Sequence, residues 1–97
     1  MFVQIIDFRS EKFEEGDKYV QEYREKTTGK NTARRAIVTK DRDEPNHYLN
    51  LVFFDSYESA MENSNLPETQ ELAEKLAGLT VEPPKFYNLE VIREETF

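Results

Sequence analysis

The order of strand and helix patterns along the chain constrains the fold more than any other feature. Short runs rich in β-branched and aromatic residues, typical of strands, occupy residues 2–8, 33–40, 47–54 and 86–92. Apolar residues at helical spacing occupy residues 13–26 and, with an interruption at 63–65, residues 57–79. The short polar link 41–46 predicts an antiparallel hairpin. The order βαββαβ predicts an α+β fold, a four-stranded antiparallel sheet with two helices on one face.

Length and charge limit the classes of protein that remain. A chain of 97 residues fits one domain spanning 1–97, and its small core makes pairing with a second copy a natural expectation. The net charge of −7 disfavours nucleic acid and anionic membrane surfaces as partners. With no cysteine, disulfides and thiolate metal sites are excluded. No basic leader and no apolar run of the ~18 residues needed to span a membrane is present, so we expect a cytoplasmic protein.

The ends of the helices carry recognisable signals. Gly16 either lies inside the first helix or belongs to a loop that ends at Asp17 as N-cap. Asp55, with an acid three residues later, resembles a capping box for the second helical region. Pro67 suits a first helical position after the interruption, and Gly78 predicts a C-terminal stop.

Alternation along the strands separates two faces of the sheet. One set is nearly all apolar, and we expect it to pack under the helices: Val3, Ile5, Leu49, Leu51, Phe53, Tyr87, Leu89 and Val91. The other set is mixed and is expected on the open face: Gln4, Ile6, Phe8, Tyr48, Asn50, Val52, Phe54, Phe86, Asn88, Glu90 and Ile92. Such a face needs a partner sheet, a ligand or RNA to cover it. We predict a homodimer formed through the sheet faces.

RNA-recognition motifs share the βαββαβ order and place aromatic residues on the open sheet face. Their third strand follows a basic residue and a glycine, whereas here Pro45, Asn46 and His47 precede the aromatic residues. Together with the negative charge, this difference argues against RNA binding.

Residues 48–76 resemble another family with this plan. A strand at 48–54 runs into Asp55, an alanine-containing helix and then a proline-interrupted segment at 66–70. This texture resembles the ferredoxin-like dimeric α/β-barrel family, whose best-known members are the antibiotic-biosynthesis monooxygenases. The resemblance covers nearly the whole chain and implies two sheets packed through their open faces. It also implies a pocket for a small apolar or aromatic compound.

The chain departs from the enzymes of that family at several positions. It has no tryptophan. Asn63 stands where relatives often carry a histidine on the second helical region, and Asp7 stands near the asparagine of haem-degrading relatives. We therefore expect no haem with an axial histidine from that region, and no other cofactor.

Three residues are candidates for catalysis. His47 is the only histidine and so the default general acid or base near neutral pH. Its alternation partners predict that it leaves the sheet on the helix-covered side, where Tyr57 or Tyr87 could hold an oxyanion. The alternatives are that His47 caps the hairpin turn and that the tyrosines are core residues. A single histidine without spaced partners predicts no metal site.

Ligand-binding candidates are Asn50, Asn63 and Arg35. The amides offer both a donor and an acceptor, although Asn50 could equally pair across the dimer. Arg34 and Arg35 are adjacent and point to opposite faces, so one of them could bind an anionic group in a bidentate manner. The acids at positions 11, 14, 15 and 17 are interpreted as a solvated helix face.

The sequence features and the family resemblance suggest two functions. The first is an enzyme without metal or cofactor, monooxygenase- or cyclase-like, that acts on a small apolar or aromatic compound. The alternative is a non-catalytic ligand-binding or assembly module whose pocket residues serve packing. An enclosed cavity with convergent polar groups would favour the enzyme.

Overall fold

The computed structural model describes every residue from Met1 to Phe97 and contains one four-stranded sheet. In chain order the elements are β1 (Phe2–Arg9), α1 (Phe13–Lys26), β2 (Arg35–Lys40), β3 (His47–Phe54), α2 (Tyr57–Ser64), α3 (Pro67–Ala77) and β4 (Lys85–Glu90). The strand order is β2-β3-β1-β4, and every neighbouring pair is antiparallel. The predicted ferredoxin-like α+β fold is confirmed. None of the helices combines the length and the apolar character that crossing a bilayer requires.

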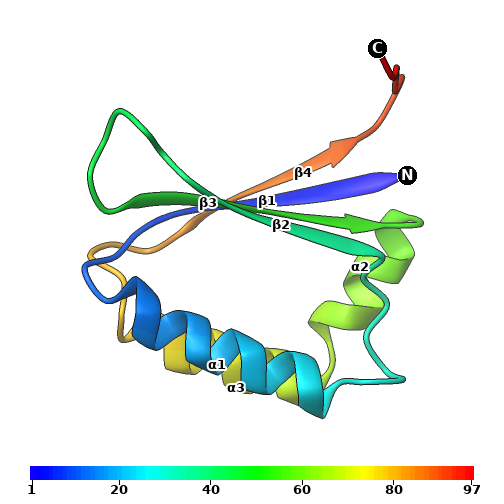
Figure 1. Cartoon of the computed structure of the whole chain (residues 1–97). Coiled ribbons are helices and arrows are strands. Elements are labelled where there is room, and N and C mark those ends of the chain that lie inside the picture. The colour runs from blue at the N-terminus through cyan, green and yellow to red at the C-terminus, as the bar shows by residue number, and fades with distance from the viewer.

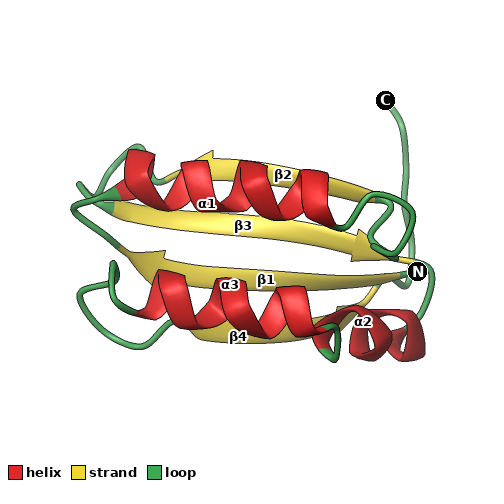
Figure 2. Cartoon of the chain, turned by 90° about the horizontal axis from the view of Figure 1, so that it is seen from below, coloured by secondary structure: helices red, strands yellow, loops and turns green.

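The helices form a single layer on one side of the sheet. Figure 1 shows α1 and α3 below the strands with no element of the chain above them, and Figure 2 shows the two helices side by side. Helices α1 and α3 pack against each other, whereas α2 is the helix whose backbone approaches β1 and β3. No Cα atom of α1 or α3 lies within 8 Å of a strand Cα atom. Large side chains must therefore span the distance between the two layers.

The assignment of the two sheet faces was wrong. The ring of Phe13 in α1 stacks on Tyr48 with 4.3 Å between centroids, and Tyr57 in α2 meets Phe2 edge-on at 5.6 Å. Since side chains alternate along a strand, the mixed set faces the helices, and the nearly all-apolar set lies on the open face. The physical reason is that the backbones of α1 and α3 lie far from the strands, which leaves room for polar side chains between the two layers. The surface that needs a further apolar partner is the open one.

The ends of the helices differ in detail from the capping signals. Helix α1 begins at Phe13, so Gly16 lies inside it, and a Cβ built there would come within 3.3 Å of Leu76 in α3. The N-cap of α2 is Ser56, whose hydroxyl accepts the Ser59 amide at 3.1 Å. The capping box predicted at Asp55 is wrong because that carboxylate instead accepts from Arg34 at 2.6 Å.

The hydrophobic core is small. Only 8 of the 97 residues are buried, and the hydrophobic ones are Phe2, Val3, Phe54 and Ala60. Phe2, Phe54 and Ala60 gather where α2 meets β1 and β3, which is the one place where a helix backbone approaches the sheet. Away from this end, most apolar side chains of the sheet remain half-buried.

Candidate functional site

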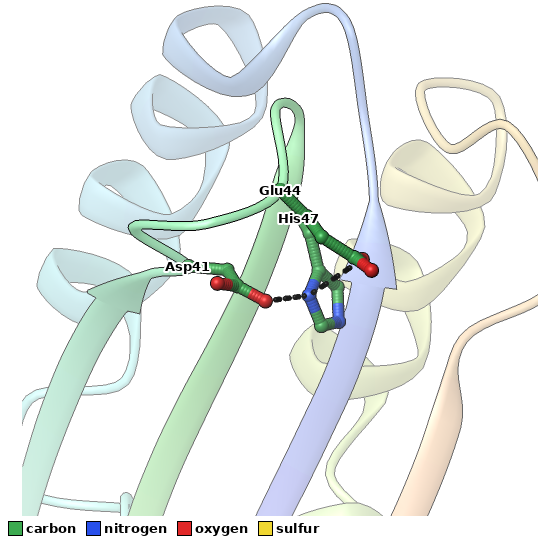
Figure 3. A group of neighbouring side chains, drawn as sticks. All are labelled: Asp41, Glu44 and His47. Carbon is green, nitrogen blue, oxygen red and sulfur yellow. Dashed lines mark hydrogen bonds and ion pairs between the residues drawn. The ribbon is translucent and has the colours of Figure 1, made fainter.

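Four side chains converge on the open face at the β2–β3 end of the sheet; we call Asp7, Asp41, Glu44 and His47 the His47 cluster. Imidazole Nε2 of His47 lies 2.6 Å from Asp7 Oδ1, and Nδ1 lies 2.7 Å from Asp41 Oδ2 and 3.7 Å from Glu44 Oε2. Figure 3 shows His47, Asp41 and Glu44 in front of the strands, with the helices behind. The prediction that His47 points to the helix-covered side is therefore wrong. Its neighbour Tyr48 takes that side by stacking on Phe13.

Hairpin geometry and strand register build this cluster. The Asp41 amide donates to the His47 carbonyl at 2.9 Å, which places the two residues opposite each other where the hairpin opens. Asn46 completes the turn in the left-handed region, with φ of 61°, a conformation that asparagine tolerates. Strand β1 pairs Arg9 with His47, so Asp7 lies diagonally from the imidazole on the same face.

The charges within the His47 cluster are complementary, because the imidazole lies between carboxylates. Hydrogen bonds from the ring to Asp41 and then Asp7 raise the pKa of His47 above its usual value, although burial opposes this. The same bond lowers the pKa of Asp41. Carboxylates can only accept, so both ring nitrogens donate when the imidazole is charged. Arg9 adds a bond from its guanidinium to Glu44 Oε2 at 2.6 Å.

A cavity of about 310 Å³ opens beside the cluster. Besides the four cluster residues, it is lined by Phe8, Arg9, Glu82, Pro83 and Lys85. Nearly every lining side chain is charged, so the cavity suits an ion or a charged group rather than an apolar compound.

A second and larger space lies between the start of α1 and the β2–β3 half of the sheet; we call it the interlayer cleft. Its volume is about 880 Å³. It is lined by Glu11, Lys12, Phe13, Glu14, Glu15, Asp17, Gln21, Val38, Thr39, Lys40 and Tyr48. One wall is aromatic, because the lining residues Tyr48 and Phe13 stack with 4.3 Å between their ring centroids. The acids interpreted as a solvated helix face therefore border a cleft.

Asn50 lies two residues along β3 from Tyr48 and faces the helices in the same way. Its Oδ1 atom is buried and has no hydrogen-bond partner. Buried acceptors are nearly always paired, which makes this carbonyl an exception within the sheet, although Asn50 does not line the cleft. The role of Asn50 as a ligand-binding residue stays a prediction.

Asn63 has a different environment. It is buried, and its amide donates to the Tyr23 hydroxyl at 3.1 Å while its carbonyl accepts the Thr32 amide at 3.3 Å. The same hydroxyl lies 2.8 Å from Thr69 Oγ1 and thereby joins α1, α2 and α3. With both ends engaged, Asn63 holds the helical layer together.

The other sequence candidates do not gather around one site. Tyr87 lies on β4 opposite Ile5 and is exposed on the open face. Tyr57 begins α2, where it contacts Phe2. The Arg35 guanidinium lies 5.2 Å from the centre of the Phe53 ring, an arrangement typical of a cation–π contact. The structure therefore brings none of these three residues to His47.

Sequence reasoning missed the partners of His47. Asp41 and Glu44 could have been found, because a hairpin whose polar turn is 41–46 brings both near residue 47. Asp7 is 40 residues away, and only the register of β1 against β3 brings it to the ring.

Comparisons place the fold within a known class. No family model matches the chain. A search of curated proteins likewise finds no relative. Solved structures do match: the fold is that of the antibiotic biosynthesis monooxygenases, as the sequence resemblance predicted.

SnoaB, a cofactor-independent oxygenase from Streptomyces nogalater, superposes with a TM-score of 0.81 at 13% identity over 96% of this chain and 94% of that one. Rv0793 from Mycobacterium tuberculosis gives 0.80 at 12% identity over 98% of both chains. An antibiotic biosynthesis monooxygenase gives 0.77 at 10% identity over 96% of this chain and 100% of that one.

Proposed function

We propose that the protein is a homodimeric, cofactor-independent enzyme, monooxygenase- or cyclase-like, that acts on a small apolar or aromatic compound in the interlayer cleft. The observation that carries this proposal is the aromatic wall formed by Tyr48 and Phe13, which both line the cleft and stack on each other. A cleft of about 880 Å³ falls within the range of small-molecule sites. Planar rings of a ligand would stack on this wall in the geometry that aromatic pairs favour.

The structural similarity supports the same reaction class. SnoaB is a cofactor-independent oxygenase with this fold. Without a cofactor, the electrons that dioxygen accepts must come from the substrate, which favours an electron-rich phenol or hydroquinone. The contribution of the protein is then to bind, orient and shield the ring.

One observation favours the alternative of a non-catalytic ligand-binding module. The only histidine faces away from the cleft, so the cleft contains no side chain whose ordinary pKa lies near neutrality. In that case the substrate itself must ionise, or no reaction occurs.

A single compound separates the two functions. We expect 1,4-dihydroxynaphthalene to bind under anaerobic conditions, where its fluorescence is measured free of tryptophan emission because the chain has no tryptophan. In air, an oxygen electrode should then record uptake faster than the uncatalysed rate, with no flavin or metal added. Val38→Arg should weaken binding by about tenfold or more, since Val38 lines the cleft and is 49% exposed.

Val81→Arg is the matched control, because Val81 is exposed in the loop before β4 and lies outside the cleft. Binding without oxygen uptake would favour the ligand-binding module. If the compound does not bind, or if both variants weaken binding equally, the cleft is not the site.

A further inference from the structure

We propose that the His47 cluster binds a divalent transition-metal ion such as Zn²⁺, with Asp41, Glu44 and His47 as its protein ligands. Candidate ligand atoms on these three residues all lie within 4.8 Å of one another, and Figure 3 shows both carboxylates turned towards the same ring nitrogen of His47. One imidazole nitrogen with two carboxylate oxygens is a donor set that Zn²⁺ accepts, and it leaves a fourth coordination position free.

The spacing along the hairpin explains why these side chains converge. Residues 41, 44 and 47 span the turn, and the bond from the Asp41 amide to the His47 carbonyl fixes its two ends. Metal–ligand bonds of about 2.0–2.2 Å need ligand atoms about 3–4 Å apart. The separation of 3.7 Å between His47 Nδ1 and Glu44 Oε2 already meets this requirement. A small rotation of the exposed Glu44 side chain brings its carboxylate closer to Asp41.

Two further residues support the ligands in the way that metal sites require. Asp7 Oδ1 lies 2.6 Å from Nε2 of His47, so it holds the proton on that nitrogen and leaves Nδ1 for the ion. Arg9 donates to Glu44 and orients its carboxylate. An acid cluster alone would not make a site, but an imidazole whose far nitrogen is bound by a separate carboxylate is the arrangement found behind metal-ligating histidines.

The charge around the cluster favours a cation. Asp7, Asp41, Glu44 and the nearby Glu82 carry four negative charges, against which Arg9 and Lys85 supply two positive ones. When the ion binds, its bond to Nδ1 of His47 replaces the hydrogen bond between Nδ1 and Asp41. The proton on Nδ1 is then released to solvent. The ion would join the β2–β3 hairpin to β1 through Asp7. This site lies on the opposite side of the sheet from the interlayer cleft, so its test does not depend on the reaction proposed there.

The test uses the full chain, stripped with a chelator and titrated with Zn²⁺ by calorimetry at pH 7.5. We expect one ion per chain, and His47→Gln should abolish binding. Asp41→Asn and Glu44→Gln should each weaken it by about tenfold or more, and Asp7→Asn by about 10–100-fold. The matched control is Asp43→Asn, which removes the same charge from the same turn but whose side chain is outside the cluster; it should bind like the wild type.

A second measurement locates the ion directly. Because His47 is the only histidine, its ring resonances are unambiguous, and substoichiometric Mn²⁺ should broaden them before any others. Circular dichroism checks that each variant is folded, and the exposed Glu44 is the substitution least able to disturb the fold. The proposal is overturned if Zn²⁺ does not bind, if Asp43→Asn weakens binding as much as Asp41→Asn, or if His47→Gln retains the affinity.

Discussion

At the scale of single residues, Glu68 shows how one ion pair couples folding to pH. It lies in the first turn of α3, where its carboxylate accepts from Lys30 across the gap to the α1–β2 loop. That bond, together with one from its own backbone amide, lowers the pKa of Glu68 below 4.5. A depressed pKa stabilises the fold above the unfolded value and ceases to do so as pH falls through the folded value.

We therefore expect Glu68→Gln to destabilise the protein at pH 6 and to have a progressively smaller effect as the pH falls below the unfolded pKa of the carboxyl group. Urea denaturation at a series of pH values measures the difference in free energy of unfolding between the wild type and the variant. This gap should begin to close as the pH falls below about 4.5. Glu74→Gln, an exposed acid on the same helix, is the control and should show no such closing gap. A gap that stays constant with pH would contradict the assignment.

Residue roles were predictable from the sequence only where the partners are local. The hairpin ends at 41 and 47 could be paired from the turn alone, whereas the contact of His47 with Asp7 depends on strand register. The N-cap of α2 is Ser56 and not the predicted Asp55, because Arg34, which lies just before β2, donates to the Asp55 carboxylate. Propensity gives no information on such competitors.

At the scale of elements, replacing two glycines by alanine is expected to change the free energy of unfolding in opposite directions. Gly78 ends α3 with φ of −74°, a conformation any residue adopts, and a Cβ there would lie 3.8 Å from its nearest neighbour. Gly29 follows α1 with φ of 86° and has open space around it. Gly78→Ala should raise the free energy of unfolding by about 0.4–1 kcal/mol by restricting the unfolded chain. Gly29→Ala should lower it by about 1–2 kcal/mol through backbone strain.

Thermal or urea denaturation of the two variants checks this pair, and each serves as the control for the other because the added methyl group is identical. Equal effects of the two substitutions would show that the conformations after α1 and α3 are not those described here.

The order and type of the elements followed from the sequence, because strand and helix periodicities are local properties. The orientation of the sheet did not follow. Alternation separates two faces but does not say which one the helices cover. The prediction that the helices cover the more apolar face assumes that they pack closely on the sheet. The backbones of α1 and α3 in fact lie away from the strands. That separation creates the interlayer cleft.

At the scale of the whole molecule, the chain exposes more surface than its mass requires. Its accessible surface is 7227 Å², whereas a compact monomer of 11.5 kDa is expected to expose about 5,800 Å². The open face contributes to the excess, because it carries the nearly all-apolar set of side chains with no covering element. The exposed apolar face supports the proposed homodimer, since two such sheets can pack face to face.

The homodimer can be tested with one substitution on that face. Leu89 lies on β4 opposite Val3 and is 43% exposed in the single chain, so Leu89→Glu should leave the monomer folded. In a face-to-face dimer the new carboxylate would be buried without a partner, which should raise the dimer dissociation constant by about tenfold or more. Light scattering at micromolar concentration should report about twice 11.5 kDa for the wild type and a lower mass for the variant. Val81→Glu adds the same charge at an exposed position in the loop before β4 and should remain dimeric. A monomeric wild type, or dissociation of both variants alike, would show that the open face is covered by something other than a second copy.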